Sequence, residues 1–246
     1  MSDDNKQQPM DLLAKGASEL GLRLSPAQLE QFDLYYREMA DWNQRVNLTS
    51  ITERDAVQIK HFLDSLTICL AYPQGMPPTL RIVDIGAGAG FPGLPLKLAF
   101  PHIRLLMVES VGKKARFLEH IVEQLGVTDV EVMTGRAEDL ARHPILRERF
   151  DLALGRGVAK MPVLLEYTLP YCVVGGRLVV LNHQSAQRDF PAAARALKAL
   201  GGRMGEIYKV GISGLTDDRI VAVIHKVAPT PSAYPRQAGV PAKRPL

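Results

Sequence analysis

A glycine-rich segment constrains the fold more than any other feature of the sequence. Residues 83–93 (VDIGAGAGFPG) follow a short apolar run and precede a helical stretch. Gly86, Gly88 and Gly90 permit a sharp turn, and they let backbone amides approach whatever binds at the carboxyl end of the preceding strand. The segment therefore predicts an α/β fold with a ligand site at this strand end.

Short β-rich runs alternate with helical stretches from residue 76 onward. This alternation is typical of βαβ units, and it predicts a Rossmann-like, mostly parallel sheet of seven strands. The clearest intervening helix covers residues 113–125, with Gly126 placed to end it. The expected strands are residues 80–85, 104–109, 130–134, 150–154, 177–181, 204–210 and 220–227.

The first 75 residues predict helices without strands. Ser25, Pro26 and Gln28 have the pattern of a capping box with proline in the first turn, so a helix is expected to begin there. A second helix is expected over residues 55–72. The apolar stripe of the first helix is expected to consist of Leu29, Phe32, Tyr36, Met39 and Ala40.

We divide the chain into a helical extension (1–75), a core (76–228) and a proline-rich, basic tail (229–246). Five prolines lie between residues 228 and 246, so we expect the tail to be extended and to pack weakly or await a partner. Its basic residues are expected either to contact phosphate groups or to be solvated surface charge. These residues are Arg236, Lys243 and Arg244.

The composition excludes few partners. The net charge is +4, which tolerates a polyanion without requiring one. No apolar run reaches the roughly 18 residues that span a bilayer, and residues 1–9 are polar rather than a basic and apolar signal, so we expect a cytoplasmic protein with no membrane contact. Cys69 and Cys172 have no second ligand at metal spacing, so we expect reduced core thiols and no metal site. We also expect a monomer.

Two cofactors compete for the glycine-rich segment. Gly88, Gly90 and Gly93 have the spacing of dinucleotide binders, which keeps a nicotinamide oxidoreductase as an alternative. Asp84 favours S-adenosylmethionine, because a carboxylate at the strand tip can orient the loop and attract the cationic methionine end. Glu109 ends the next strand, 23 residues after Gly86. There it can accept hydrogen bonds from both ribose hydroxyls of either cofactor.

Two further strand ends carry candidate binding residues. Ala137 and Glu138 follow the third strand at the height of an adenine ring, although an acidic helix cap would use the same residues. Arg156 follows the fourth strand between two glycines that let its backbone approach a ligand. A salt bridge to one of the acidic residues of the site is the structural alternative for Arg156.

These features resemble the RsmG (GidB) family of methyltransferases, which modify a guanine N7 in small-subunit ribosomal RNA. The resembling segments are residues 42–49, His61 with 64–66, 84–93 with 95–96, 113–118, 136–138, and 234–239 with Pro241. The resemblance implies a class I methyltransferase fold, S-adenosylmethionine as cofactor and 16S ribosomal RNA or the small ribosomal subunit as partner. The expected cofactor contacts are Gly86, Gly88, Gly90, Phe91, Glu109, Ala137, Glu138 and Arg156.

The chain departs from the family pattern at two places. Gly155-Arg156-Gly157 stands where the family commonly has Ser-Arg-Ala, and Leu181-Asn182-His183 stands where it commonly has Leu-Lys-Gly. Losing that lysine removes a possible phosphate or base contact near the methyl acceptor. A methyltransferase acting on another RNA or a small molecule, and a non-enzymatic RNA-binding module, therefore stay open as alternatives.

No catalytic acid or base is expected. The N7 lone pair of guanine is available at neutral pH without loss of a proton, so transfer requires alignment of nitrogen, methyl carbon and sulfur. Asn43 and Asn47 could contact a flipped base from the helical extension, but a turn-forming role is the favoured interpretation of both.

Overall fold

The computed structural model describes residues 10–157, 159–185, 190–215 and 217–246. Within these residues, seven strands form one sheet in the order β3-β2-β1-β4-β5-β7-β6. β7 runs antiparallel to β5 and β6, and the other neighbours are parallel, so the predicted seven-stranded, mostly parallel sheet is confirmed. The strands are β1 Arg81–Ile85, β2 Arg104–Glu109, β3 Val130–Thr134, β4 Phe150–Leu154, β5 Cys172–His183, β6 Gly202–Lys209 and β7 Arg219–Lys226.

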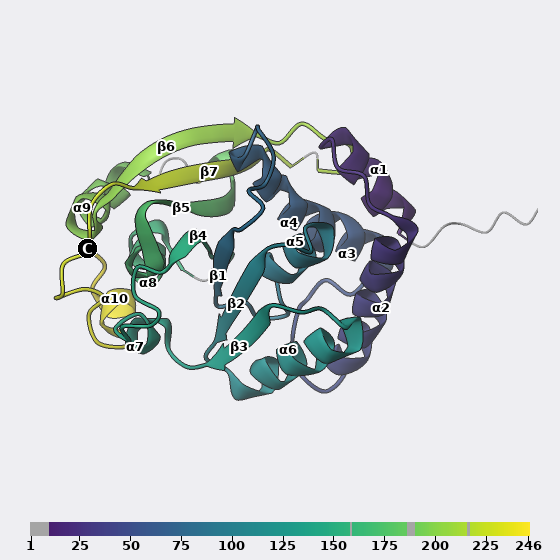
Figure 1. Ribbon diagram of the computed structural model, residues 1–246, viewed down its shortest axis with the longest axis horizontal. Helices are drawn as coiled ribbons and strands as arrows, with labels where there is room; N and C mark the ends of the chain where they lie inside the picture. Colours follow the sequence, from purple (N-terminus) through teal and green to yellow (C-terminus); the bar gives the residue numbers. More distant parts are fainter. Residues whose placement is uncertain (1–9, 158, 186–189, 216) are drawn as a thin grey trace, which may run out of the picture.

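Helices cover both faces of the sheet (Figure 1). One apolar cluster joins the helical extension, α5 and α6 to one face, and a second joins α7, α8 and α9 to the other. The α-helices are α1 Asp11–Glu19, α2 Pro26–Asn43, α3 Arg54–Val57, α4 Asp64–Leu66, α5 Gly93–Ala99, α6 Gly112–Leu125, α7 Ala137–Leu140, α8 Met161–Thr168, α9 Phe190–Leu200 and α10 Val240–Lys243. Turns of 3₁₀-helix cover Thr67–Ala71 and Leu169–Tyr171.

The capping box of α2 is present and also contacts the core. Ser25 Oγ accepts from Gln28 N at 3.2 Å, and Gln28 Oε1 accepts from Ser25 N at 2.8 Å. Gln28 Nε2 donates to the carbonyl of Leu98 in α5 at 2.7 Å. The first turn of α2 is thereby tied to the helix that follows the glycine-rich segment.

The helix expected over residues 55–72 is helical throughout but is not one α-helix. α3 passes into a π-helical turn at Gln58–Leu63, then into α4 and a 3₁₀ turn. A π turn admits one extra residue per turn, which changes the direction of the side chains that follow. His61 and Asp64 both come to contact Arg156 from this stretch, as described below.

The expectation of a weakly packed tail is wrong. Proline lacks an N–H but keeps its carbonyl, and the tail carbonyls are used: Arg142 donates to Pro235 O at 2.6 Å and Arg147 to Pro231 O at 3.1 Å. Arg236, expected among phosphate contacts or solvated charges, pairs instead with buried Glu166.

Three smaller expectations concern the ends of the chain and its thiols. No described helix is long and apolar enough to cross a membrane. Residues 1–9, which were not expected to form a signal, lie outside the described residues. Cys172 is buried and Cys69 half-buried, both are free thiols, and burial raises their pKa values to about 12 and about 11.

Candidate active site

The carboxylate of Asp84 stabilises the glycine-rich loop. Asp84 Oδ2 accepts from Gly93 N at 2.8 Å, so the strand tip and the start of α5 are joined across the loop. The side chain is fully buried, and Oδ1 has no partner among the described residues. Burial raises the pKa of Asp84 to about 6, with the Gly93 amide opposing the shift. At neutral pH a buried negative charge therefore lies beneath the loop.

The helical extension also contacts the glycine-rich loop. Tyr35 in α2 is fully buried, and its hydroxyl donates to the carbonyl of Ala89. Gly90 has φ +95°, and a Cβ there would collide with the Tyr35 hydroxyl, so glycine is required on both counts. Tyr36, expected in the apolar stripe, is half-buried and packs against the core, but Tyr35 is the fully buried tyrosine of α2. Spacings of three and four residues both fit a helical face, so periodicity did not single out Tyr35.

Glu109 ends β2 next to this loop. Its Oε2 accepts from Gly88 N at 2.9 Å and its Oε1 from Val111 N at 2.8 Å. The side chain is buried, yet each carboxylate oxygen has a second lone pair for a further donor. Glu109 thus fixes two loops and keeps the acceptor capacity that a ribose contact requires.

A groove at the carboxyl ends of β1, β2 and β3 brings some of the expected cofactor residues together. It contains Gly86, Ala137 and Glu138, whereas Gly88, Gly90, Phe91, Glu109 and Arg156 lie outside its lining. The lining consists of Ile85, Gly86, Val108, Ser110, Gly135, Arg136, Ala137, Glu138 and Tyr167. Larger hollows open at the amino ends of the strands, around Arg81 and Arg104, away from these residues.

Glu138 is part of the groove and also has a structural partner. Its side chain is almost fully buried, and Oε1 accepts from the backbone N of Gly239 in the tail at 2.8 Å. Arg136 donates to the same oxygen at 3.3 Å. The carbonyl of Ala137 accepts from the Tyr171 hydroxyl at 2.8 Å. The start of α7 is therefore fixed by its own N-cap residue and by contacts from two other parts of the chain.

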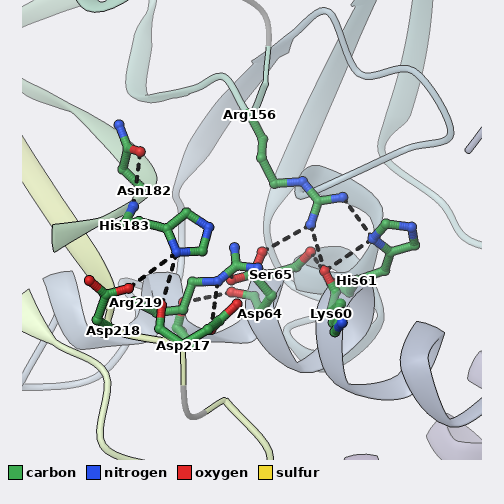
Figure 2. Close-up of polar contacts among 11 residues, drawn as sticks. Lys60, His61, Asp64, Ser65, Arg156, Asn182, His183, Asp217, Asp218 and Arg219 are labelled. Atoms are coloured by element: carbon green, nitrogen blue, oxygen red, sulfur yellow. Dashed lines mark hydrogen bonds and ion pairs between the residues drawn. The ribbon is translucent and has the colours of Figure 1, made fainter. Parts of the chain in front are cut away.

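Arg156 extends from the end of β4 to the helical extension (Figure 2). It donates from Nη1 to Asp64 Oδ2 at 3.0 Å and from Nη2 to His61 Nδ1 at 3.0 Å. Its guanidinium lies 5.1 Å from the ring centre of Phe91, which also stacks on His61 at 4.5 Å. A salt bridge to an acidic residue of the core was the structural alternative for Arg156, but its partner Asp64 belongs to the helical extension.

Asp64 joins two arginines from different strands. Its Oδ1 accepts from Arg219 Nη1 at 3.1 Å, while its Oδ2 binds Arg156, and the carboxylate is 1% exposed. Burial raises the pKa of Asp64, and the two guanidinium groups oppose this shift. Sequence reasoning assigned no role to Asp64 or Arg219, although Asp64 lies in a segment that carried the family resemblance.

His61 is neutral at physiological pH in this cluster. Burial and the charge of Arg156 lower its pKa to about 4. A neutral ring accepts from Arg156 at Nδ1 and donates from Nε2 to Thr49 Oγ1, 2.8 Å away. Asn43 fixes the turn before this threonine, because its Oδ1 accepts from Leu48 N at 2.8 Å and Thr49 N at 3.0 Å. The contacts of Asn43 are therefore those of a turn-forming asparagine.

Asn182 and His183 lie at the same edge of the sheet. His183 ends β5 directly opposite Arg219 at the start of β7. Its Nδ1 donates to the Asp217 carbonyl at 2.9 Å, and Asn182 Oδ1 accepts from His183 N at 2.9 Å. Figure 2 places this pair beside the cluster formed by Asp64 and its arginines. The strand ends thus collect Arg156, Arg219 and His183 within one region.

The sheet, the loop after β1 and the acidic residue that ends β2 define a Rossmann-like α/β domain of the methyltransferase type. The structure of a SAM dependent methyltransferase from Aquifex aeolicus has the same fold, with a TM-score of 0.51 and 15% identity over 71% of this chain and 94% of that chain. The chain belongs to the GidB family, described as rRNA small subunit methyltransferase G, whose model matches residues 28–213. The family resemblance seen in the sequence is confirmed.

Full-length relatives agree with this assignment. The ribosomal RNA small subunit methyltransferase G of Dehalococcoides mccartyi (strain CBDB1) is 47% identical over 237 residues, which cover 96% of this chain and all of the relative. The protein of the same name from Roseiflexus castenholzii is 48% identical over the same length and with the same coverage. The similarity therefore includes the helical extension and the tail as well as the core.

Proposed function

We propose that this chain transfers the methyl group of S-adenosylmethionine to N7 of a guanine in 16S ribosomal RNA. The observation that carries the proposal is its membership of the rRNA small subunit methyltransferase G family, with relatives 41–48% identical over nearly the whole chain. The contacts at the carboxyl ends of the strands support it, because they leave a groove there and bring together two arginines that are paired with Asp64.

The cofactor is assigned to the strand ends of β1, β2 and β3. In this arrangement the adenine lies in the groove beside Ala137 and Glu138, and Glu109 accepts from the ribose hydroxyls. The methionine end lies over the glycine-rich loop, where the buried charge of Asp84 attracts its ammonium group. Gly86, Gly88, Gly90, Phe91 and Arg156 are the remaining residues of the proposed cofactor site.

The proposed reaction moves no proton. The lone pair of N7 forms the new bond to the methyl carbon while the carbon–sulfur bond breaks, so the sulfonium becomes a neutral thioether and the guanine becomes cationic. A nucleophile that is already unprotonated needs no general base, and the protein contributes mainly alignment. Arg156 is unsuited to contact the developing cation, and its pairing with Asp64 keeps its charge partly compensated.

The departure at Asn182 and His183 leaves an arginine at the same strand end. His183 pairs across the sheet with Arg219, whose side chain is 15% exposed and in contact with Asp64 and Asp217. Arg219 and Arg156 can contact RNA phosphates in place of the lysine that the family commonly has after the fifth strand. A methyltransferase acting on another RNA or a small molecule is therefore the less favoured alternative.

The proposal extends to partner and setting. We assign the 16S ribosomal RNA, free or in the small subunit, as the partner of a monomeric enzyme that works in the cytoplasm. Of the basic residues in the tail, Lys243 and Arg244 are exposed and remain available to RNA, whereas Arg236 is paired with Glu166.

The test uses methyl-labelled S-adenosylmethionine and small subunits from a strain that lacks this protein. Nucleoside analysis of the product should find the label in 7-methylguanosine from 16S RNA. Glu109→Gln should lower cofactor affinity and labelling, whereas Glu131→Gln, on an exposed position of β3, should change neither. Label in another nucleoside or another RNA, or no label with cofactor binding intact, would refute the assignment of the acceptor.

A further inference from the structure

The C-terminal tail is anchored to α7 and α8, two of the elements that line the groove of the candidate site. Arg236 donates to Glu166 of α8 from Nε at 2.9 Å and from Nη2 at 2.6 Å, and its backbone N donates to the same carboxylate at 2.8 Å. Three residues later, Gly239 N donates to Glu138 of α7 at 2.8 Å. The tail thus binds one buried carboxylate on each of these helices.

The two carboxylates reach the groove in different ways. Glu138 lines it, whereas Glu166 precedes Tyr167 in α8, and Tyr167 lines it. Burial and the negative charge of Glu138 raise the pKa of Tyr167. A shift of the tail would therefore move groups on two sides of the groove.

The burial of these acids makes the anchors strong. Glu166 is 0% exposed and Glu138 is 1% exposed. A carboxylate buried to this extent is costly without hydrogen-bond donors, and a bidentate arginine is the donor set that best fits it. The donors on Glu166 that the structure describes all come from Arg236, so the conformation of α8 at this point depends on the tail.

The segment between α7 and β4 holds the tail from its other side. Arg142 donates to Pro235 O at 2.6 Å, and Arg147 donates to the carbonyls of Thr230 at 2.7 Å and Tyr234 at 2.9 Å. These contacts flank the peptide that carries Arg236. The tail is consequently fixed in register before it reaches Glu166 and Glu138.

We propose that Arg236 is a positioning residue for the cofactor, because it fixes the tail whose contacts with Glu166 and Glu138 set the shape of the adenosine groove. This proposal rests on the proposed function, since it takes the groove as the adenosine site. It assigns the buried contacts of the tail to cofactor binding and leaves only its exposed end, Lys243 and Arg244, for RNA.

The test compares matched tail variants of the full chain. Affinity for S-adenosylhomocysteine is measured by calorimetry, and kcat and both KM values are measured with S-adenosylmethionine and small subunits. Arg236→Ala should weaken S-adenosylhomocysteine binding about 10-fold and raise the KM for S-adenosylmethionine similarly, with kcat and the KM for the subunit changed less than about twofold. Arg236→Lys, which keeps the charge and loses the bidentate geometry, should recover part of the affinity. The double variant Lys243→Ala/Arg244→Ala should leave cofactor affinity unchanged.

A second variant covers the case in which Arg236→Ala does not fold. Arg142 is exposed, so Arg142→Ala removes one hydrogen bond to the tail without opening the core, and a two- to threefold loss of S-adenosylhomocysteine affinity is expected. The proposal is overturned if folded Arg236→Ala, or Arg142→Ala where the former is unfolded, binds S-adenosylhomocysteine as wild type does. If the wild-type protein itself fails to bind this ligand, the proposed function fails along with it.

Discussion

Replacing Asp84 by asparagine should reveal how much the buried charge beneath the glycine-rich loop costs the fold. The folded-state pKa of Asp84 is about 6, against an ordinary value of 3.8. A carboxyl group with a raised folded-state pKa stabilises the fold while it is protonated, below about pH 4. That contribution is lost as the pH rises through 6. Asparagine keeps an acceptor for Gly93 N and does not titrate, so the variant lacks this pH dependence.

The size of the effect follows from the difference between the two pKa values. At about 1.4 kcal/mol for each pH unit, the full contribution is about 3 kcal/mol. Over the convenient range from pH 5 to pH 7.5, wild type should lose about 1.4 kcal/mol of unfolding free energy relative to Asp84→Asn. Other groups titrate alike in both proteins, so the difference between the two curves isolates Asp84.

Urea unfolding followed by circular dichroism at pH 5.0, 6.0 and 7.5 provides the measurement. Curves for the two proteins that stay parallel within about 0.3 kcal/mol would refute the raised pKa. On the proposed function, the same variant should bind S-adenosylhomocysteine about 10-fold more weakly at pH 7.5, because the ligand ammonium loses its counter-charge. Glu131→Gln serves as the control for a carboxylate lost from an exposed strand position.

Three further predictions test the other contacts of the site. Asp64→Ala should destabilise the protein by about 3–5 kcal/mol in urea, because it removes the buried carboxylate that two largely buried arginines share; a loss below 1 kcal/mol would contradict this. Gly90→Ala should cost more than Gly21→Ala, which shares a positive φ but has no neighbour within 4 Å, and equal losses would show that the Tyr35 contact is unimportant. His61→Gln should remove a loss of about 2 kcal/mol that wild type shows as the pH falls from 7.5 to 5, since a histidine with a pKa of about 4 stabilises only in its neutral form; identical pH curves would exclude that pKa.

The sequence predicted the sheet because each strand has its own apolar run and its own turn residues. Its limits appear where pairing depends on distant partners. β5 begins at Cys172 rather than residue 177, because Cys172 pairs with Phe150 across an irregular register that no local pattern reveals. The tail was misjudged for a related reason: its prolines predict an extended chain, but the acids that bind Arg236 and Gly239 lie about 70 and 100 residues earlier.

The glycine-rich loop of the candidate site could be predicted from the sequence, but the residues that support the site could be predicted only in part. The acidic residues near the ends of β1 and β2 and the glycines between them follow a local pattern, so Asp84 and Glu109 could be selected from sequence alone. Asp64 could be singled out only through family resemblance, because its role depends on meeting Arg156, which follows β4, and Arg219 at the start of β7. A buried carboxylate between two arginines has no signature in the sequence around it.

The two ends of the chain support the same strand ends, and this bears on how the proposed reaction works. The helical extension contacts the glycine-rich loop through Tyr35 and Arg156 through Asp64, while the tail contacts α7 through Gly239. A transfer that uses no general base depends on alignment, and a displacement of about 1 Å at such a site is enough to reduce the rate strongly. The extension and the tail are therefore better understood as parts of the active site than as additions to a self-sufficient core.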